Sequence, residues 1–221
     1  MSLFRKTVLR SLLALGVFHP LNNFRRDRRF RQESRVALSA WRAKGKPAPP
    51  PDCLKYDCIR QYARQFATPI LVETGTWKGD AVFALRNNFR EIHSIELAPE
   101  IHAEAKKTLA HLPHIHLHFG DSGHELPRVA RGLTERTLYW LDGHWCAANS
   151  ARGEKDSPIV EELNFLLNRP IGHDVVLVDD ARCFIGQDGY PTIEELRALV
   201  AARRPTATFE VSADIIRIVP V

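Results

Sequence analysis

Short apolar runs and segments with helical spacing alternate along most of the chain from residue 70 onward. Strands are expected at residues 70–72, 91–95, 115–119, 137–141, 175–178, 208–211 and 215–219, and helices near residues 80–87, 100–109, 124–130, 159–167 and 193–202. Strands that alternate with helices are joined by crossovers and form a parallel sheet, whereas the short link between the last two strands suits an antiparallel hairpin. The pattern therefore predicts a doubly wound, mostly parallel α/β fold that ends in an antiparallel hairpin.

The first 50 residues follow a different pattern. An apolar run at residues 8–21 is followed by many arginines, and residues 47–51 hold four prolines in five positions, which excludes a helix or a central strand. Residues 56–66 again show helical spacing and are expected to cover the sheet before its first strand. We expect two parts: a basic amphipathic helical arm with a proline-rich linker at 1–50, and an α/β domain at 51–221.

Charge is concentrated in the arm. Residues 1–50 hold twelve Lys and Arg against Asp27 and Glu33, a balance of +10 in a chain whose net charge is +5. The apolar run is shorter than the roughly 20 residues that span a bilayer, and no cleavage site of a secretory signal follows it. Two interpretations stay open: the arm lies on an anionic membrane surface, or it packs on the domain or on a partner subunit of a homo-oligomer. Nucleic-acid binding is disfavoured because no recognition module accompanies the arginines.

The cysteines indicate a reducing compartment. None of the four is part of a C-x-x-C pair that would indicate a structural zinc site or a disulfide framework; they are Cys53, Cys58, Cys146 and Cys183. We therefore expect a cytoplasmic protein, peripheral at the inner membrane face if the arm binds lipid.

The stretch Glu73-Thr74-Gly75-Thr76-Trp77-Lys78-Gly79-Asp80 connects the first predicted strand to a helix. Such a glycine turn lets a nucleotide-like ligand lie against bare backbone at a helix N-terminus. The spacing E-x-G-x-x-x-G lacks the third glycine of a dinucleotide fingerprint, which disfavours an NAD-dependent dehydrogenase. Glycine turns of this kind are also common for structural reasons alone.

A carboxylate follows each of the first five predicted strands. These residues are Glu73, Glu96, Asp121 (before Ser122), Asp142 (before Gly143, His144 and Trp145), and the pair Asp179 and Asp180. Ligands of open α/β sheets bind beyond the carboxyl ends of the strands, where an acid can accept hydrogen bonds from a ribose diol. Three of the acids, Asp142, Asp179 and Asp180, also suit a hard divalent cation with oxygen ligands.

The ordered motifs ETGTWKGD, SIE, GDS, LDGHW and VDD resemble class I S-adenosylmethionine-dependent methyltransferases. Within them, the macrocin O-methyltransferase group, which acts on sugar hydroxyls, is the most similar over residues 55–221. The resemblance implies a Rossmann-like methyltransferase fold, with S-adenosylmethionine and a divalent cation, normally magnesium, as cofactors. It assigns the cofactor to Glu73, Thr74, Gly75, Gly79, Glu96, Asp121, Ser122 and Asp142, and the cation to Asp142, Asp179 and Asp180.

The sequence departs from this group at one position. The macrocin pattern reads LDGD, with the second acid as the base, where this chain reads LDGH. His144, beside the catalytic Asp142, would then be the general base, since an imidazole with a pKa of about 6.5 can take a hydroxyl proton near neutrality. The alternatives are that His144 packs in its loop or is a further metal ligand.

These features predict a metal-assisted O-methyltransferase that acts on a small-molecule or glycan acceptor, at a sugar hydroxyl. Two other functions remain open: an enzyme like the cephalosporin hydroxylases, with the same fold and different chemistry, and a non-catalytic, membrane-tethered protein that binds the cofactor.

Three alternating histidines, His114, His116 and His118, would share one face of the third predicted strand. That strand is an edge strand in the family, so we expect partly solvated side chains there and not a metal site, because one strand face fixes ligand geometry only loosely.

Overall fold

The computed structural model describes residues 18–143, 158–169, 173–187 and 189–221. The chain divides into two compact units, Met1–Pro47 and Ala48–Val221. The sequence pattern predicts a boundary between residues 50 and 51.

The described part of the first unit is one long helix, α2 (Phe18–Ala43), followed by a turn. Pro20 lies in the first turn of α2, where a missing backbone N–H breaks no intrahelical hydrogen bond. Its polar residues include a dense group of arginines, and Arg29 pairs with Glu33 one turn later at 3.4 Å. Most of the apolar run at 8–21 lies outside the described residues. Among the described helices, none combines the length and apolarity needed to cross a membrane.

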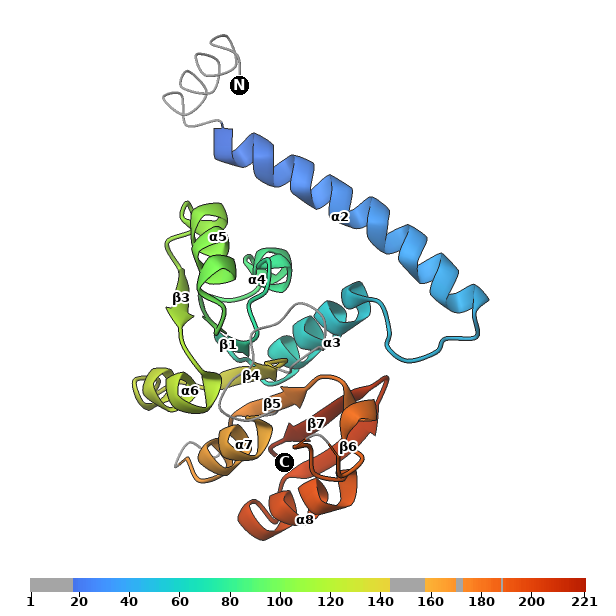
Figure 1. Ribbon diagram of the computed structural model, residues 1–221, viewed down its shortest axis with the longest axis vertical. Coiled ribbons are helices and arrows are strands. Elements are labelled where there is room, and N and C mark those ends of the chain that lie inside the picture. The colour runs from blue at the N-terminus through green and yellow to red at the C-terminus, as the bar shows by residue number, and fades with distance from the viewer. Residues whose placement is uncertain (1–17, 144–157, 170–172, 188) are drawn as a thin grey trace. The chain divides into compact units, whose positions relative to one another are not determined.

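The second unit is built on a seven-stranded sheet (Figure 1). Its strands are β1 (Ile70–Thr74), β2 (Glu91–Glu96), β3 (Ile115–Phe119), β4 (Thr137–Leu141), β5 (Val175–Val178), β6 (Thr208–Ser212) and β7 (Ile215–Val219). They follow the order β3-β2-β1-β4-β5-β7-β6. The first five pair in parallel, and β7 runs antiparallel to both β5 and β6. The predicted doubly wound sheet with an antiparallel C-terminal hairpin is confirmed.

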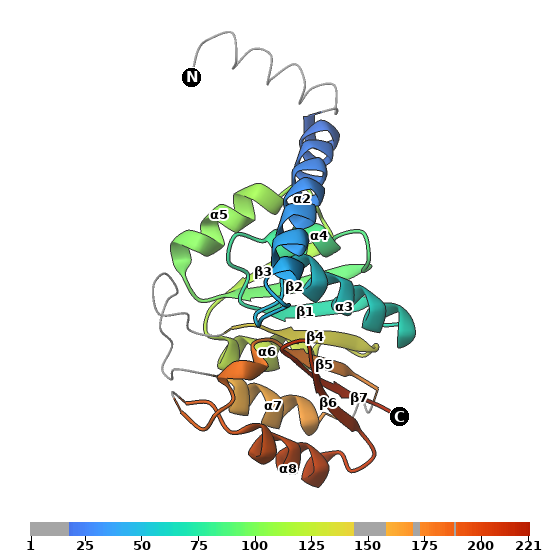
Figure 2. The ribbon, with the colours of Figure 1, turned by 90° about the vertical axis from the view of Figure 1, so that its right-hand side faces the viewer.

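Helices cover both faces of the sheet (Figure 2). One layer holds α3 (Asp52–Gln65), α4 (Asp80–Leu85) and α5 (Pro99–Leu109), and the other holds α6 (Ser122–Arg131), α7 (Ile159–Leu167) and α8 (Ile193–Arg203); a short 3₁₀ turn, η1 (Ala181–Cys183), follows β5. Because both faces are covered, every residue of β1, β4 and β5 is buried, including Glu73 and Thr74 at the end of β1. The helix predicted at 56–66 begins four residues earlier, at Asp52, which brings Lys55 into it.

The strand order reverses between β1 and β4. From β1 the chain proceeds outward to β2 and β3, and it then returns to β4 on the other side of β1. Such a switch point opens a crevice beyond the carboxyl ends of the two central strands, which is where ligands of open α/β sheets bind. The acids predicted from the sequence therefore follow strands that end around this crevice.

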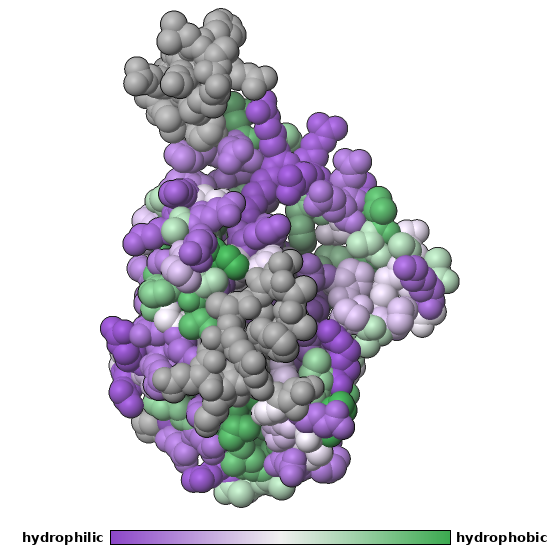
Figure 3. Space-filling model, viewed as in Figure 1, coloured by the Kyte–Doolittle hydropathy of each residue, from purple (hydrophilic) through white to green (hydrophobic). Residues whose placement is uncertain are grey.

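The surface of the α/β unit is mixed in character. Hydrophilic and hydrophobic residues are interspersed on the face shown in Figure 3. The large apolar side chains exposed on this unit include Trp77, Phe119 and Ile185, which lie on different elements.

Candidate cofactor and acceptor site

The glycine turn after β1 packs tightly against the end of β4. Gly75 has a φ of +86°, and a Cβ at this position would overlap the backbone carbonyl oxygen of Asp142. The Gly75 and Thr76 amides both donate to the carbonyl oxygen of Ile95, at 2.9 and 3.2 Å. The turn is thus fixed to β2 on one side and to the first residue beyond β4 on the other. The sequence predicts that a ligand lies close to the backbone of Gly75. The structure shows that the backbone of Asp142 also lies close to it.

Gly79 ends the turn and begins α4. Its φ of +70° is a left-handed conformation that favours glycine, and a Cβ here would lie 2.9 Å from Leu109 Cδ1 on α5. The start of α4 is therefore held close to α5, with its first backbone N–H groups at the end of the glycine turn.

Glu96, the last residue of β2, is held by two backbone amides. The Trp77 amide donates to Oε2 at 2.8 Å, and the Ala98 amide donates to Oε1 at 2.9 Å. Trp77 itself has a φ of +48° and is 43% exposed. Each carboxylate oxygen can accept a second hydrogen bond, so the fixed carboxylate is suited to accept from a ribose diol.

Glu73 lies beneath the turn and is fully buried. Ser94 Oγ, on the neighbouring strand, donates to Glu73 Oε2 at 2.5 Å, and Thr76 Oγ1 lies 2.6 Å from the same Ser94 hydroxyl. Burial raises the pKa of Glu73 to about 8, against the lowering effect of the Ser94 hydrogen bond. The side chain is therefore mostly protonated at neutral pH, and its carboxyl group is hydrogen-bonded to Ser94.

Asp121 and Ser122 begin α6 beside the turn. Asp121 Oδ1 caps this helix by accepting from the Gly123 amide at 2.8 Å. Ser122 and Thr74 both hydrogen-bond to the carboxyl group of Glu162, which enters from α7. Thr74 Oγ1 also accepts from the amides of Asp142 and Gly143, at 3.3 and 3.2 Å. Thr74 and Ser122 thus meet at one point, between the glycine turn and the end of β4.

Glu162 is a residue that the sequence analysis missed. It is 1% exposed, its Oε1 has no hydrogen-bond partner among the described residues, and burial raises its pKa to about 7. A signal for it was present: Glu162 lies three residues after Ile159 and four before Leu166, on the apolar face of a strongly apolar helix. A buried carboxyl group at that place needs a polar partner.

The acids that follow β4 and β5 form a second group, here called the carboxylate cluster: Asp142, Asp179 and Asp180. Asp179 is fully buried, and its Oδ1 accepts from the Asp180 amide at 2.8 Å. Burial and the neighbouring charge of Asp179 raise the pKa of Asp142 well above its usual value, and burial raises that of Asp179 to about 6. Asp180 has a left-handed φ of +57° and pairs with Arg182 at 2.7 Å. Asp179 and Asp180 are thus buried acids at the end of β5, beside the acid that follows β4.

Lys55 is the second residue that the sequence analysis missed. It reaches the carboxylate cluster from α3, with Nζ at 2.5 Å from Asp179 Oδ2 and 3.7 Å from Asp180 Oδ1. Burial lowers the pKa of Lys55, but the charge and hydrogen bond of Asp179, with the charges of Asp142 and Asp180, outweigh burial and raise it overall. Lys55 is therefore a charged ammonium group inside the site.

A divalent cation fits the carboxylate cluster in donor type. Magnesium is a hard cation that takes oxygen ligands such as carboxylates. The oxygens of the carboxylate cluster are too far apart to bind one ion together. Among the described residues, only Glu91, His93 and His116 bring three ligand atoms within 4.8 Å of one another. The Lys55 ammonium also occupies the bonding position on Asp179. An ion would therefore require Lys55 to leave Asp179 and the carboxylates to close in.

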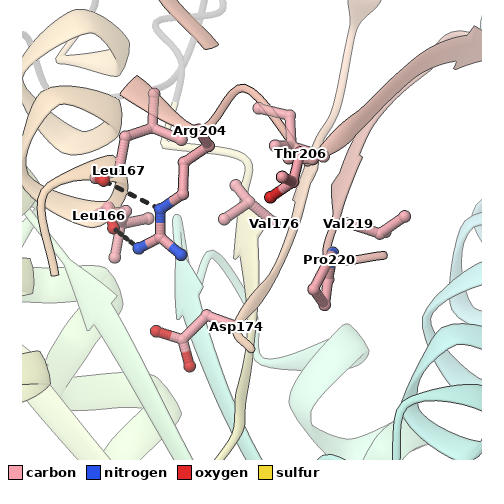
Figure 4. A pocket seen from close by; sticks show the side chains of 10 residues that line it. Leu166, Leu167, Asp174, Val176, Arg204, Thr206, Val219 and Pro220 are labelled. Atoms are coloured by element: carbon pink, nitrogen blue, oxygen red, sulfur yellow. Dashed lines mark hydrogen bonds between the residues drawn. The ribbon is translucent and has the colours of Figure 1, made fainter. Parts of the chain in front are cut away.

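Two other features bear on the site. His144, the predicted base, lies outside the described residues, although the preceding Asp142 and Gly143 are described. A small pocket between β5, β7 and α7 lies beside Asp174, at the opposite end of β5 from Asp179, where Arg204 donates to the carbonyl oxygens of Leu166 and Leu167 at 3.2 and 3.0 Å (Figure 4). These bonds satisfy carbonyl groups at the C-terminal end of α7, a structural role.

No protein-family model and no curated protein matches this sequence. Solved structures do match. An S-adenosylhomocysteine-bound methyltransferase of Podospora anserina, PaMTH1, is 17% identical with a TM-score of 0.52, over 76% of this chain and 78% of its own. The O-methyltransferase TomG of Streptomyces achromogenes, solved with S-adenosylmethionine, is 16% identical with a TM-score of 0.51, over 85% and 89%.

An O-methyltransferase of Bacillus cereus in complex with S-adenosylhomocysteine is 13% identical, with a TM-score of 0.51 over 84% of this chain and 90% of its own. At these identities the similarity concerns the fold. The second unit of this chain has the fold of S-adenosylmethionine-dependent methyltransferases.

Proposed function

We propose that this protein is an S-adenosylmethionine-dependent O-methyltransferase that acts on a sugar or glycan hydroxyl with the help of a divalent cation. The observation that carries the proposal is the contact between the glycine turn and the carboxylate cluster. Gly75, in the turn, packs on the carbonyl group of Asp142, in the cluster. A methyl donor on the turn and an acceptor on the cluster would therefore be neighbours.

The turn and the strand ends would bind the cofactor. Glu96, with its two oxygens already oriented by backbone amides, would accept hydrogen bonds from the ribose hydroxyls. Asp121 and Ser122, at the start of α6, would contact the adenine. When bound, S-adenosylmethionine supplies an electrophilic methyl group, and a divalent cation on the cluster supplies a Lewis acid that lowers the pKa of the acceptor hydroxyl.

The chain's own groups would manage the acceptor proton. His144 would accept the proton as the acceptor oxygen attacks the methyl carbon and the sulfonium sulfur keeps the electron pair of the broken carbon–sulfur bond. Asp142 would orient the acceptor. Lys55, once displaced from Asp179, would remain close enough to place its positive charge beside the developing alkoxide.

Ligand-induced stabilisation tests the proposal directly. S-adenosylhomocysteine is expected to raise the Tm of the full-length protein, and magnesium is expected to raise it further in the presence of that ligand. Transfer of a labelled methyl group to a panel of glycan acceptors then tests the reaction. Failure of both ligands to shift the Tm would exclude the methyltransferase and the cation together.

The base is tested by His144→Ala, with the exposed His124→Ala as its matched control. We expect the His144 variant to bind S-adenosylhomocysteine as the wild type does and to lose turnover by about 10²-fold or more, the usual contribution of a general base. Turnover at the wild-type level in His144→Ala would remove the base from this proposal.

We also propose that the basic arm binds an anionic membrane surface, which would favour a lipid-linked glycan as the acceptor. Support comes from the six arginines between residues 25 and 35 on α2, since each basic residue near such a surface contributes about 1 kcal/mol. Sedimentation with phosphatidylserine-containing vesicles should separate the wild type from a full-length variant with these six residues changed to glutamine. Equal sedimentation would contradict membrane binding.

A further inference from the structure

Four polar side chains converge on β2 and β3, away from the cofactor site. Glu91 and His93 are two residues apart on β2 and so face the same way, and His116 is the register partner of His93 on β3. His93 Nε2 lies 2.9 Å from Glu91 Oε1, and His116 Nε2 lies 3.4 Å from the same oxygen. One ligand atom from each of the three residues lies within 4.8 Å of the others.

We propose that Glu91, His93 and His116 form a binding site for a transition-metal dication of the zinc type. The sequence pattern places His114, His116 and His118 on one strand face and predicts partly solvated side chains there. The structure changes that set: His114 turns away and bonds the carbonyl oxygen of Arg86 at 2.8 Å, while β2 contributes an imidazole and a carboxylate.

Two of the three spacings between ligand atoms suit tetrahedral coordination. Zinc lies about 2.0–2.1 Å from nitrogen and oxygen ligands, which places two ligand atoms of a tetrahedron about 3.3–3.4 Å apart. The pair Glu91–His116, at 3.4 Å, already has this separation, and the pair Glu91–His93, at 2.9 Å, needs to open by only about 0.4 Å. Three protein ligands would leave a fourth position for water.

A fourth residue supports the site from behind. His118 Nε2 lies 3.0 Å from His93 Nδ1, the ring nitrogen that does not face Glu91. Histidine ligands of metals usually have their second nitrogen hydrogen-bonded in this way, which fixes the ring orientation and the tautomer.

The chemistry of the donors selects the metal. Imidazole ligands favour zinc, nickel, cobalt and copper over magnesium, whereas the carboxylate cluster offers only oxygen donors. The two sites also lie at opposite ends of their strands, since Glu91 is the first residue of β2 and the carboxylate cluster follows β4 and β5. Because β3 is the edge strand of the sheet, a metal bridging His116 to β2 would fasten that edge.

The test is zinc titration of untagged, full-length protein that has been stripped of metal with a chelator, using calorimetry and the visible absorption of cobalt as a spectroscopic probe. We expect saturable binding, a tetrahedral cobalt spectrum and a higher Tm with zinc. His116→Ala and Glu91→Gln should each weaken binding at least about tenfold, and His118→Ala should weaken it about tenfold by releasing the His93 ring. His116 has a side chain that is 45% exposed, so its loss is not expected to unfold the protein.

Two variants serve as controls. His124→Ala removes an exposed histidine of α6 that is not part of the proposed site. Asp179→Asn removes a buried carboxylate of the carboxylate cluster, so zinc that bound there and not at the proposed site would be lost. Both should keep the zinc site. Absence of saturable zinc binding, or zinc binding that His116→Ala and Glu91→Gln leave unchanged, would overturn the proposal. Binding of S-adenosylhomocysteine by His116→Ala reports separately on the proposed function.

Discussion

Lys55 Nζ and Asp179 Oδ2 lie 2.5 Å apart although 124 residues separate them in the sequence. Their ion pair joins α3, which precedes the sheet, to the end of β5. Of the cations on described residues, Lys55 makes the shortest contact with the acids where the sequence predicts magnesium. The carboxylate cluster thus carries an internal counter-charge before any ion binds.

Removal of this counter-charge should change metal binding. Lys55→Met keeps most of the apolar stem and removes the ammonium group, so that a divalent ion no longer competes with a cation for Asp179. We expect magnesium and manganese to bind Lys55→Met about tenfold more tightly than the wild type, a change of about 1.4 kcal/mol. Calorimetric titration in the presence of S-adenosylhomocysteine measures this difference.

The exposed Lys106→Met, on α5, is the matched control and should bind these metals as the wild type does. The same Lys55→Met protein should lose stability without metal, because the buried Asp179 is left without its partner. Identical metal titrations for Lys55→Met and the wild type would show that Lys55 and the ion do not share a position.

Gly75 should tolerate no side chain. Alanine there would combine a strained left-handed φ with overlap on the Asp142 carbonyl group, and we expect Gly75→Ala to lower the free energy of unfolding by about 2 kcal/mol or more. Gly45→Ala is a matched control, since Gly45 has a similar φ of +80° with no atom within 4 Å of an added Cβ. Chemical denaturation of both variants separates overlap from backbone strain: equal losses would mean that the Asp142 contact does not matter.

The central strands, β1, β4 and β5, were predictable because burial on both faces leaves nearly continuous apolar runs. The bounds predicted for β3, β4, β5 and β7 are those of the structure, and the others differ by one or two residues. Helix ends were less accurate, because local contacts decide them: Asp121 caps α6, which begins at Ser122, two residues before the predicted start. Gly75 was chosen for a ligand, and only the structure reveals its contact with Asp142.

The site was predictable where it depends on topology alone. Acids at the carboxyl ends of parallel strands must lie along one edge of the sheet, whatever their separation in sequence. Lys55 and Glu162 could not be placed this way, because they reach the site from helices whose rotation is set by packing. The grouping of Glu91 with His93 and His116 depends on the register between β2 and β3, which the pattern of either strand does not encode.

Glu96 should control cofactor affinity without controlling the fold. Glu96→Gln keeps one carbonyl oxygen for a backbone amide but presents an NH₂ group to the other, and it loses the charge that favours a ribose diol. We expect S-adenosylhomocysteine to bind this variant about 10- to 100-fold more weakly, because two charge-assisted hydrogen bonds are affected. Calorimetry measures the affinity, and the exposed Glu100→Gln is the control. Unchanged affinity in Glu96→Gln would place the ribose elsewhere.

Glu73 should make stability depend on pH. Its pKa is raised by burial to about 8 in the folded protein, from about 4.5 when unfolded, so the folded state holds the proton more tightly. This contribution to stability is fully present below pH 4.5 and is lost as the pH rises through 8. Between pH 5 and pH 8, the free energy of unfolding of the wild type should therefore fall by about 2–4 kcal/mol more than that of Glu73→Gln, which keeps an acceptor for Ser94 but does not ionise. Urea denaturation across this range measures both slopes, with Glu100→Gln as the control; parallel slopes for the wild type and Glu73→Gln would mean that Glu73 ionises normally in the folded protein.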